Sequence, residues 1–168
     1  GEKLITSKSD PVFGGVYKLA AIEEDGQWVP RIKISETVQK VTTPYFKNVY
    51  RFFFKEDDSP VADYITMRDE VVDVENGITI FDPNATWKRR FIKDIYAKEM
   101  MHKIYDKGTL VYELPKLEDI RSYCLDQVAH LWDEVKRFEY PHKYYVDLSE
   151  KLWNSKQELL TKITMQAK

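Results

Sequence analysis

The chain has 168 residues, 43% of them hydrophobic, and a formal net charge of −2 at pH 7. This composition is that of a globular protein long enough for a sizeable core, and the charge argues against a general nucleic-acid binder. No apolar run approaches the roughly 20 residues of a membrane-spanning helix, and a single cysteine, Cys124, excludes an intrachain disulfide and fits a reducing compartment.

The first predicted element is a β-hairpin made by residues 14–22 and 27–35. The dipeptide Asp25-Gly26 lies between two alternating apolar runs, which is the strongest short-range signal for a two-residue hairpin loop. The register that follows from this loop pairs Glu24 with Gln27 and Ile22 with Val29.

The same register places three cationic side chains on one face of the hairpin. Ala20 then lies opposite Arg31, and Lys18 lies opposite Lys33. Like charges directly opposite each other destabilise an antiparallel pair, so the pattern indicates a missing anion. The alternative is that Lys18, Lys33 and Arg31 are solvated on the polar face of an ordinary hairpin, since Lys and Arg are common on exposed strands.

A second hairpin is predicted from residues 46–55 and 61–67, joined by the polar, turn-prone span 56–60. The charged span 68–77 follows and is the best internal boundary. Its carboxylates are interpreted as a solvated linker rather than an acid/base pair: Asp69, Glu70, Asp73 and Glu75. The expected organisation is therefore residues 1–12, 13–67 and 68–168.

The last part of the chain is predicted to combine short strands with two helices. The strand candidates are residues 78–81, 87–92, 100–105 and 109–112, with a turn at 106–108. The first helix is indicated by an apolar stripe with three- and four-residue steps: Leu117, Ile120, Cys124, Val128, Leu131, Val135 and Phe138. The second helix begins near Ser149, which we expect to be its N-cap. The predicted fold class is therefore α+β.

No residue of the chain is a good candidate for a catalytic group or a metal ligand. His102, His130 and His142 are too scattered for a metal site, which requires ligands at close spacing. We expect His130 to be exposed and His142 to make a structural hydrogen bond. Cys124 belongs to the apolar stripe and is interpreted as a core residue.

Several motifs follow one another in order along the chain: Gly1-Glu2-Lys3-Leu4-Ile5-Thr6-Ser7, Asp10-Pro11, Gly14-Gly15-Val16-Tyr17-Lys18-Leu19, Arg31-Ile32-Lys33-Ile34-Ser35-Glu36, Val49-Tyr50-Arg51, Leu117-Glu118-Asp119-Ile120 and Pro141-His142-Lys143-Tyr144-Tyr145-Val146-Asp147-Leu148-Ser149. Together these motifs closely resemble the carboxy-terminal third of bacterial nicotinate phosphoribosyltransferases. The resemblance covers essentially the whole chain. Because the chain lacks an initiator Met and opens within a motif, we expect it to be part of a larger enzyme.

The resemblance implies an enzyme that makes nicotinate mononucleotide from nicotinate and phosphoribosyl pyrophosphate. The reaction is coupled to ATP hydrolysis through a phosphohistidine, so ATP and Mg are the expected cofactors. The family's members are cytoplasmic dimers with an α/β barrel, and the histidine belongs to that barrel. No nucleic-acid or membrane partner is expected. The alternative is a standalone α+β interaction module without catalytic activity.

The resemblance also implies roles for four residues in binding phosphoribosyl pyrophosphate. Lys18 and Lys33 resemble two lysines that contact the pyrophosphate, and Gly1 resembles the glycine of a loop that holds the 5′-phosphate. Glu2 departs from the family's usual threonine and would repel a phosphate. Arg31 is a candidate through its place beside the lysines, and the resemblance does not single it out.

Overall fold

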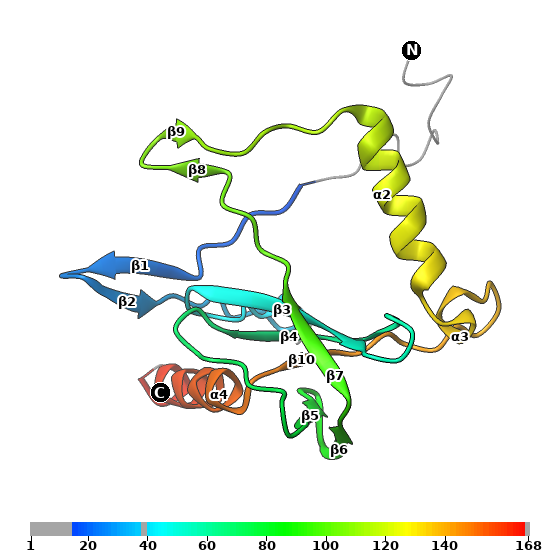
Figure 1. Ribbon diagram of the computed structural model, residues 1–168. Helices are drawn as coiled ribbons and strands as arrows, with labels where there is room; N and C mark the ends of the chain where they lie inside the picture. Colours follow the sequence, from blue (N-terminus) through cyan, green and yellow to red (C-terminus); the bar gives the residue numbers. More distant parts are fainter. Residues whose placement is uncertain (1–14, 38–39, 167–168) are drawn as a thin grey trace, which may run out of the picture. The chain divides into compact units, whose positions relative to one another are not determined.

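The computed structural model describes residues 15–37 and 40–166 (Figure 1). The chain divides into two compact units, Gly1–Phe46 and Lys47–Lys168. The first unit contains the hairpin of β1 (Ala21–Glu24) and β2 (Gln27–Pro30). Its loop residues Asp25 and Gly26 have φ values of 51° and 77°, the left-handed pair that a type I′ turn requires. Glu24 pairs with Gln27 and Ile22 with Val29, so the predicted loop and register are confirmed.

The predicted pairing of Lys18 with Lys33 is wrong, because the ladder ends before it reaches them. The last paired residues are Ala21 and Pro30, followed by one hydrogen bond from the Arg31 amide to the Ala20 carbonyl, 2.9 Å. Beyond this point the β2 side of the hairpin bonds to a later segment instead, because the Lys33 carbonyl accepts the amide of Thr42 at 3.4 Å. This exchange avoids a ladder pair in which two ammonium groups would face each other.

The second unit is built on a four-stranded sheet with the order β10-β4-β3-β7. The strands are β3 (Lys47–Phe54), β4 (Pro60–Met67), β7 (Ile95–Glu99) and β10 (Val146–Leu148). β3 and β4 are antiparallel, which confirms the predicted second hairpin, whereas β10 runs parallel to β4. The sheet therefore brings the residues before the last helix beside a strand some 80 positions earlier, at the pairs Val146–Asp63 and Leu148–Ile65.

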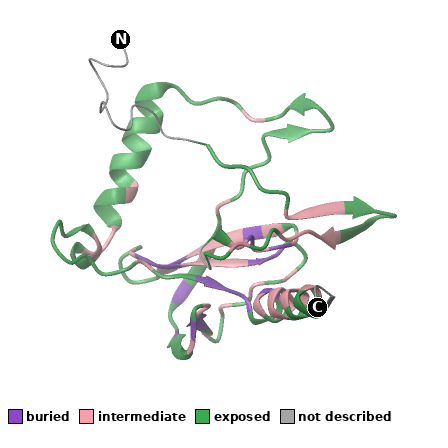
Figure 2. Cartoon of the chain, turned by 180° about the vertical axis from the view of Figure 1, so that it is seen from behind, coloured by how far each residue is buried: buried purple, intermediate pink, exposed green. Residues whose placement is uncertain are grey.

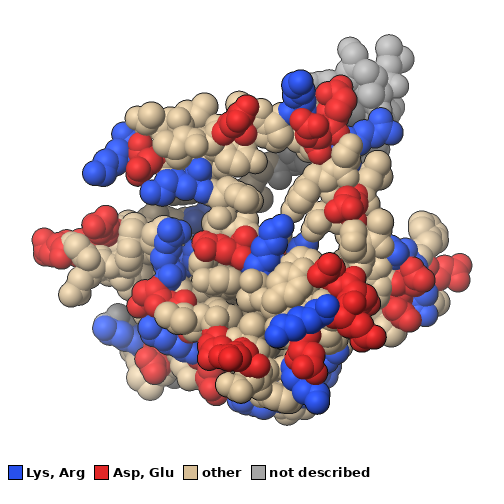
Figure 3. Space-filling view, in the orientation of Figure 1, with Lys and Arg blue, Asp and Glu red and all other residues tan. Residues whose placement is uncertain are grey.

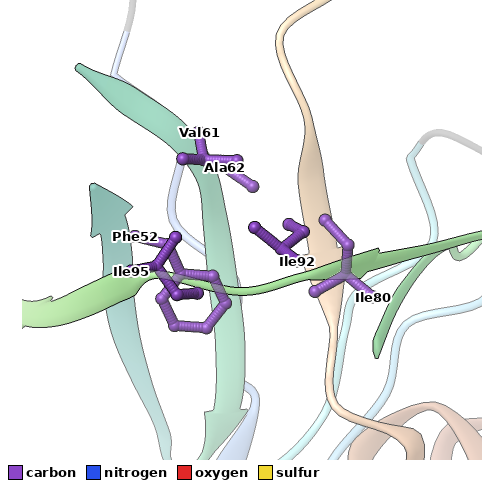
Figure 4. Packing of buried hydrophobic residues seen from close by; sticks show 6 residues of the cluster. All are labelled: Phe52, Val61, Ala62, Ile80, Ile92 and Ile95. Atoms are coloured by element: carbon purple, nitrogen blue, oxygen red, sulfur yellow. The ribbon is translucent and has the colours of Figure 1, made fainter. Parts of the chain in front are cut away.

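A second hairpin of this unit, β5 (Ile78–Asp82) and β6 (Ala85–Ile92), supplies the rest of the core. It confirms two of the predicted strands. The buried cluster combines side chains from five strands, which lie around a common centre in Figure 4: Phe52, Val61, Ala62, Ile80, Ile92 and Ile95. At most 3% of any of these residues is exposed, so their burial supplies the main favourable term for folding the unit.

The predicted strand at residues 100–105 is wrong, because the strand that pairs with β3 lies at Ile95–Glu99. Ile95 is 1% exposed, whereas Met101 and Ile104 are 47% and 38% exposed. Only a two-residue strand, β8 (Tyr105–Asp106), remains near the predicted position, and it pairs with β9 (Thr109–Leu110). Tertiary pairing with β3 therefore selected the segment whose side chains reach the core.

The predicted first long helix is interrupted. α2 (Leu117–His130) ends where Leu131 and Trp132 take extended backbone angles, and a four-residue turn of helix, α3 (Asp133–Lys136), follows. Trp132 leaves the helix and lies 6.3 Å and 6.2 Å from the ring centres of Tyr144 and Tyr145. These aromatic contacts explain why the apolar stripe does not continue as one helix.

α2 buries none of its residues, and it appears exposed along nearly all its length in Figure 2. Cys124 is exposed, so its interpretation as a core residue is wrong. The stripe is nevertheless apolar, with Leu117, Ile120 and Val128 exposed by 75%, 49% and 47%. The residues described here provide no surface that covers this face of the helix.

The predicted start of the last helix is confirmed. α4 (Glu150–Gln166) follows Ser149, whose Oγ accepts the amide of Leu152 at 3.1 Å, as an N-cap does. The same hydroxyl donates to Oε1 of Glu70 at 2.7 Å, and that oxygen accepts the amide of Met67 at 2.6 Å. Glu70 therefore connects β4 to the start of α4 and is not part of a solvated linker, which corrects that interpretation. Among the residues in view, no helix is both long enough and apolar enough to cross a bilayer.

We expect Ser149→Ala to lower the free energy of unfolding by about 1–2 kcal/mol, because it removes the cap and leaves Glu70 with one donor fewer. Urea titration of both proteins measures this difference. Ser155→Ala, within the same helix, is the control and should change stability by less than about 0.5 kcal/mol. Equal losses for the two variants would show that the cap contributes nothing of its own.

Candidate functional site

The structure keeps Lys18 and Lys33 exposed in the first unit. The Lys18 ammonium donates to the Lys40 carbonyl, and Lys33 uses its backbone carbonyl to accept Thr42. Neither lysine has a carboxylate within ion-pair distance among the described residues. Both ammonium groups are therefore available to an anion that the described residues do not supply.

Arg31 differs from the two lysines because it already has a partner. Its guanidinium lies 2.7 Å from Oε1 of Glu24 and donates to the Pro30 carbonyl at 3.1 Å. Of the three cations predicted to lack a partner, Lys18 and Lys33 therefore remain without a carboxylate partner among the described residues. Gly1 and Glu2 lie outside the described residues, so the proposed phosphate loop has no structural account here.

The second unit contains a cavity of about 460 Å³ that the sequence did not reveal. Three segments enclose it: the β5–β6 hairpin, Trp132 between α2 and α3, and the chain that leads into β10. Its lining consists of Ile80, Asp82, Lys88, Arg90, Trp132, Pro141, His142, Lys143, Tyr144, Tyr145, Val146 and Asp147. Its size is within the range typical of small-molecule sites.

Asp147 is the least accessible charged group of this cavity, with 3% of the residue exposed. Burial, followed by the nearby negative charge of Asp82, raises the pKa of the Asp147 carboxyl to about 6, and Lys143 opposes the shift. The Asp147 carboxylate accepts no hydrogen bond from the part of the chain that is described. The Asp147 carboxylate faces the cavity, so its oxygens can accept donors from water or from a ligand there.

A rigid network fixes one wall of the cavity. Asp63 accepts two hydrogen bonds from the Arg51 guanidinium, at 2.7 and 3.0 Å, and a third from the Tyr144 hydroxyl at 3.2 Å. Burial, followed by the Asp63 charge, raises the pKa of Tyr144. The Tyr144 hydroxyl therefore stays protonated and holds its ring in place.

The histidines lie in different environments. His130 is exposed, as expected. His142 lines the cavity, and its backbone amide donates to the Glu134 carbonyl at 2.8 Å, which closes the loop after α3. No cluster of three or more potential metal ligands occurs within residues 15–37 and 40–166.

Sequence reasoning missed the cavity because its residues come from distant segments. One signal was present: Asp147 lies between Val146 and Leu148 in a strand whose neighbours are apolar. The cavity is lined by charges of both signs, and cationic and acidic side chains are likewise interspersed on the face drawn in Figure 3.

Comparison with known proteins defines the class of this chain. A family model described as "Nicotinate phosphoribosyltransferase C-terminal domain" matches residues 46–156. The match begins one residue before the second unit and includes its sheet and its cavity. The chain belongs to the nicotinate phosphoribosyltransferase family.

Individual relatives extend the similarity through the first unit. The chain is 42% identical over 163 residues to nicotinate phosphoribosyltransferase of Bacillus subtilis (strain 168), covering 97% of this chain and 33% of the relative. It is 31% identical to the Dictyostelium discoideum protein of the same name, covering 95% of this chain and 28% of that protein. The chain thus spans about a third of the length of the relatives it matches.

A solved structure supports the observed fold. The crystal structure of human nicotinic acid phosphoribosyltransferase superposes with a TM-score of 0.70 and 27% sequence identity, covering 88% of this chain and 27% of that one. The predicted α+β class is therefore confirmed, and the match with the carboxy-terminal part of an enzyme disfavours a standalone interaction module.

Proposed function

We propose that this chain is the carboxy-terminal part of an enzyme of NAD biosynthesis. The enzyme forms nicotinate mononucleotide and pyrophosphate from nicotinate and phosphoribosyl pyrophosphate, with hydrolysis of ATP. The observation that carries the proposal is the 42% identity to the Bacillus subtilis enzyme over 97% of the chain, since it spans both units.

Within this enzyme Lys18 and Lys33 bind the pyrophosphate of the sugar substrate. Negative charge accumulates on the leaving pyrophosphate as the glycosidic carbon becomes cationic, and ammonium groups held near it stabilise that charge. The exposure of both lysines and their lack of a carboxylate partner among the described residues support this role. Arg31, already paired with Glu24, contributes less. Gly1 binds the 5′-phosphate through its backbone amide.

The remaining components of the site belong to the rest of the enzyme. We propose that the enzyme uses ATP and Mg, and that the phosphohistidine belongs to the part of the enzyme outside this chain. We also propose that the enzyme is a cytoplasmic homodimer without nucleic-acid or membrane partners. None of the described residues covers the apolar face of α2, which supports a larger assembly, because a solvated helix rarely displays such a stripe.

The proposal is tested by assaying the full-length protein with nicotinate, phosphoribosyl pyrophosphate and ATP. We expect nicotinate mononucleotide from the full-length protein and none from the 168-residue chain alone, because the chain offers no catalytic constellation. A heat-inactivated sample is the control. A full-length protein that yields no mononucleotide would refute the function, and product from the short chain would refute the dependence on the remaining part.

A further inference from the structure

The cavity of the second unit has a floor, walls and a rim of different chemistry. Two carboxylates form the acidic floor: Asp147, of which 3% is exposed, and Asp82, which is partly exposed. Asp82 accepts the amide of Asn84 at 2.8 Å, whereas Asp147 accepts nothing from the described residues. Asp147 can therefore accept an N–H or O–H donor from a ligand in the cavity.

The walls are aromatic and already ordered. Trp132 lies against both Tyr144 and Tyr145, with ring centres 6.3 and 6.2 Å apart, and the bond to Asp63 fixes Tyr144. The Arg90 guanidinium lies 5.5 Å from the centre of the Tyr145 ring. These tilted rings form an aromatic surface against which a planar ligand can pack.

The rim carries three cations: Lys88, Arg90 and Lys143, all exposed. None of them forms an ion pair with a carboxylate of the described chain. By contrast, Arg89 points away from the cavity, where it lies near Glu150 and over the Phe81 ring. The two neighbouring arginines of β6 thus differ. Arg89 has a carboxylate partner within the protein, whereas Arg90 faces the cavity and has no carboxylate partner among the described residues.

We propose that this cavity binds a purine nucleotide, with the base packed against the aromatic walls and the phosphate at the cationic rim. The exocyclic amine of the base donates to Asp147, and the phosphate is held by Arg90 and Lys143. One ligand of this class accounts for the unpartnered carboxylate, the aromatic surfaces and the unpaired cations together. The inference does not depend on the roles proposed for Lys18 and Lys33.

Simpler occupants leave part of the site unexplained. A free phosphate would satisfy the rim but would place no donor on Asp147 and would not use the aromatic walls. A divalent cation would meet only two carboxylates and three nearby positive charges, which is a poor site for a hard metal ion. Competition with inorganic phosphate distinguishes the free anion from a nucleotide.

The test is photoaffinity labelling of the full-length protein with 8-azidoadenosine 5′-monophosphate, followed by peptide mapping. We expect label on Trp132 or within residues 141–147. Adenosine 5′-monophosphate should suppress this label at concentrations at least tenfold lower than adenosine or inorganic phosphate. Equal suppression by phosphate alone would reduce the site to an anion site, and label confined to other peptides would refute the proposal.

Matched variants locate the interactions. Arg90→Ala should weaken protection by adenosine 5′-monophosphate at least tenfold, whereas Arg89→Ala, one residue away on the opposite face, should leave it unchanged. Asp147→Asn should weaken protection similarly while preserving the volume of the side chain. Arg90 is exposed, so its variant keeps the test valid if Asp147→Asn alters folding. Equal effects of Arg90→Ala and Arg89→Ala would contradict the proposed geometry.

Discussion

Lys18→Ala and Lys33→Ala are each expected to lower kcat/KM for phosphoribosyl pyrophosphate by roughly 10- to 150-fold in the full-length enzyme. A charge-assisted hydrogen bond is worth about 1.5–3 kcal/mol, and its loss in the transition state converts to that range of rates. Affinity for nicotinate should change much less, because the lysines are proposed to contact only the pyrophosphate. Steady-state kinetics with each substrate varied in turn, and direct titration with nicotinate, measure the two effects.

The structure also fixes what these variants should leave unchanged. Both lysines are exposed, and the ladder that would have opposed them is absent, so we expect thermal stability without ligand to remain within about 0.5 kcal/mol of the original. Lys93→Ala, an exposed lysine of the second unit, is the matched control. If both variants fold and retain the original sugar kinetics, Lys18 and Lys33 are ordinary solvated side chains.

Asp147→Asn is expected to stabilise the protein at pH 7.5 by about 1–3 kcal/mol. The pKa of Asp147 is raised from 3.8 to about 6 by burial and by Asp82. At about 1.4 kcal/mol for each pKa unit, ionised Asp147 disfavours the folded state by up to about 3 kcal/mol. The carboxylate faces a cavity that is large enough for water, which lowers the expected gain within that range.

The sign of the pH dependence follows from the raised pKa. The folded state binds the Asp147 proton more tightly than the unfolded chain, so this group's favourable contribution is complete below pH 3.8 and is lost as the pH rises through about 6. Asparagine resembles the neutral acid, and the difference between the two proteins should therefore shrink towards zero near pH 4. Urea titrations at pH 7.5 and 4 compare them.

Glu75→Gln is the control for this comparison, because the Glu75 side chain is exposed and does not line the cavity. It should give less than about 0.5 kcal/mol at either pH. A stability gain from Asp147→Asn that is equal at both pH values would show that shape, rather than ionisation, separates the two proteins.

Local signals in the sequence predicted the elements whose determinants lie within a few residues. Asp25-Gly26 specified a two-residue loop because both positions require positive φ, which these residues tolerate. Ser149 specified the start of α4 because its hydroxyl can reach the amide of Leu152 within one helical turn. The family resemblance, carried by ordered motifs along the whole chain, was likewise present in the sequence and is confirmed by the comparisons.

The tertiary structure decided which segments became strands and helices, and which side chains came together in the cavity. Pairing with β3 selected Ile95–Glu99 over residues 100–105, and contacts with Tyr144 and Tyr145 drew Trp132 out of the predicted helix. The cavity depends on the parallel pairing of β10 with β4 and on the neighbouring β5–β6 hairpin, so Asp147 meets Asp82 and Arg90 across 57 to 65 positions of sequence. Periodicity and turn signals describe neighbours along the chain. Burial and the pKa of Asp147 depend on neighbours in space, which only the folded sheet brings together.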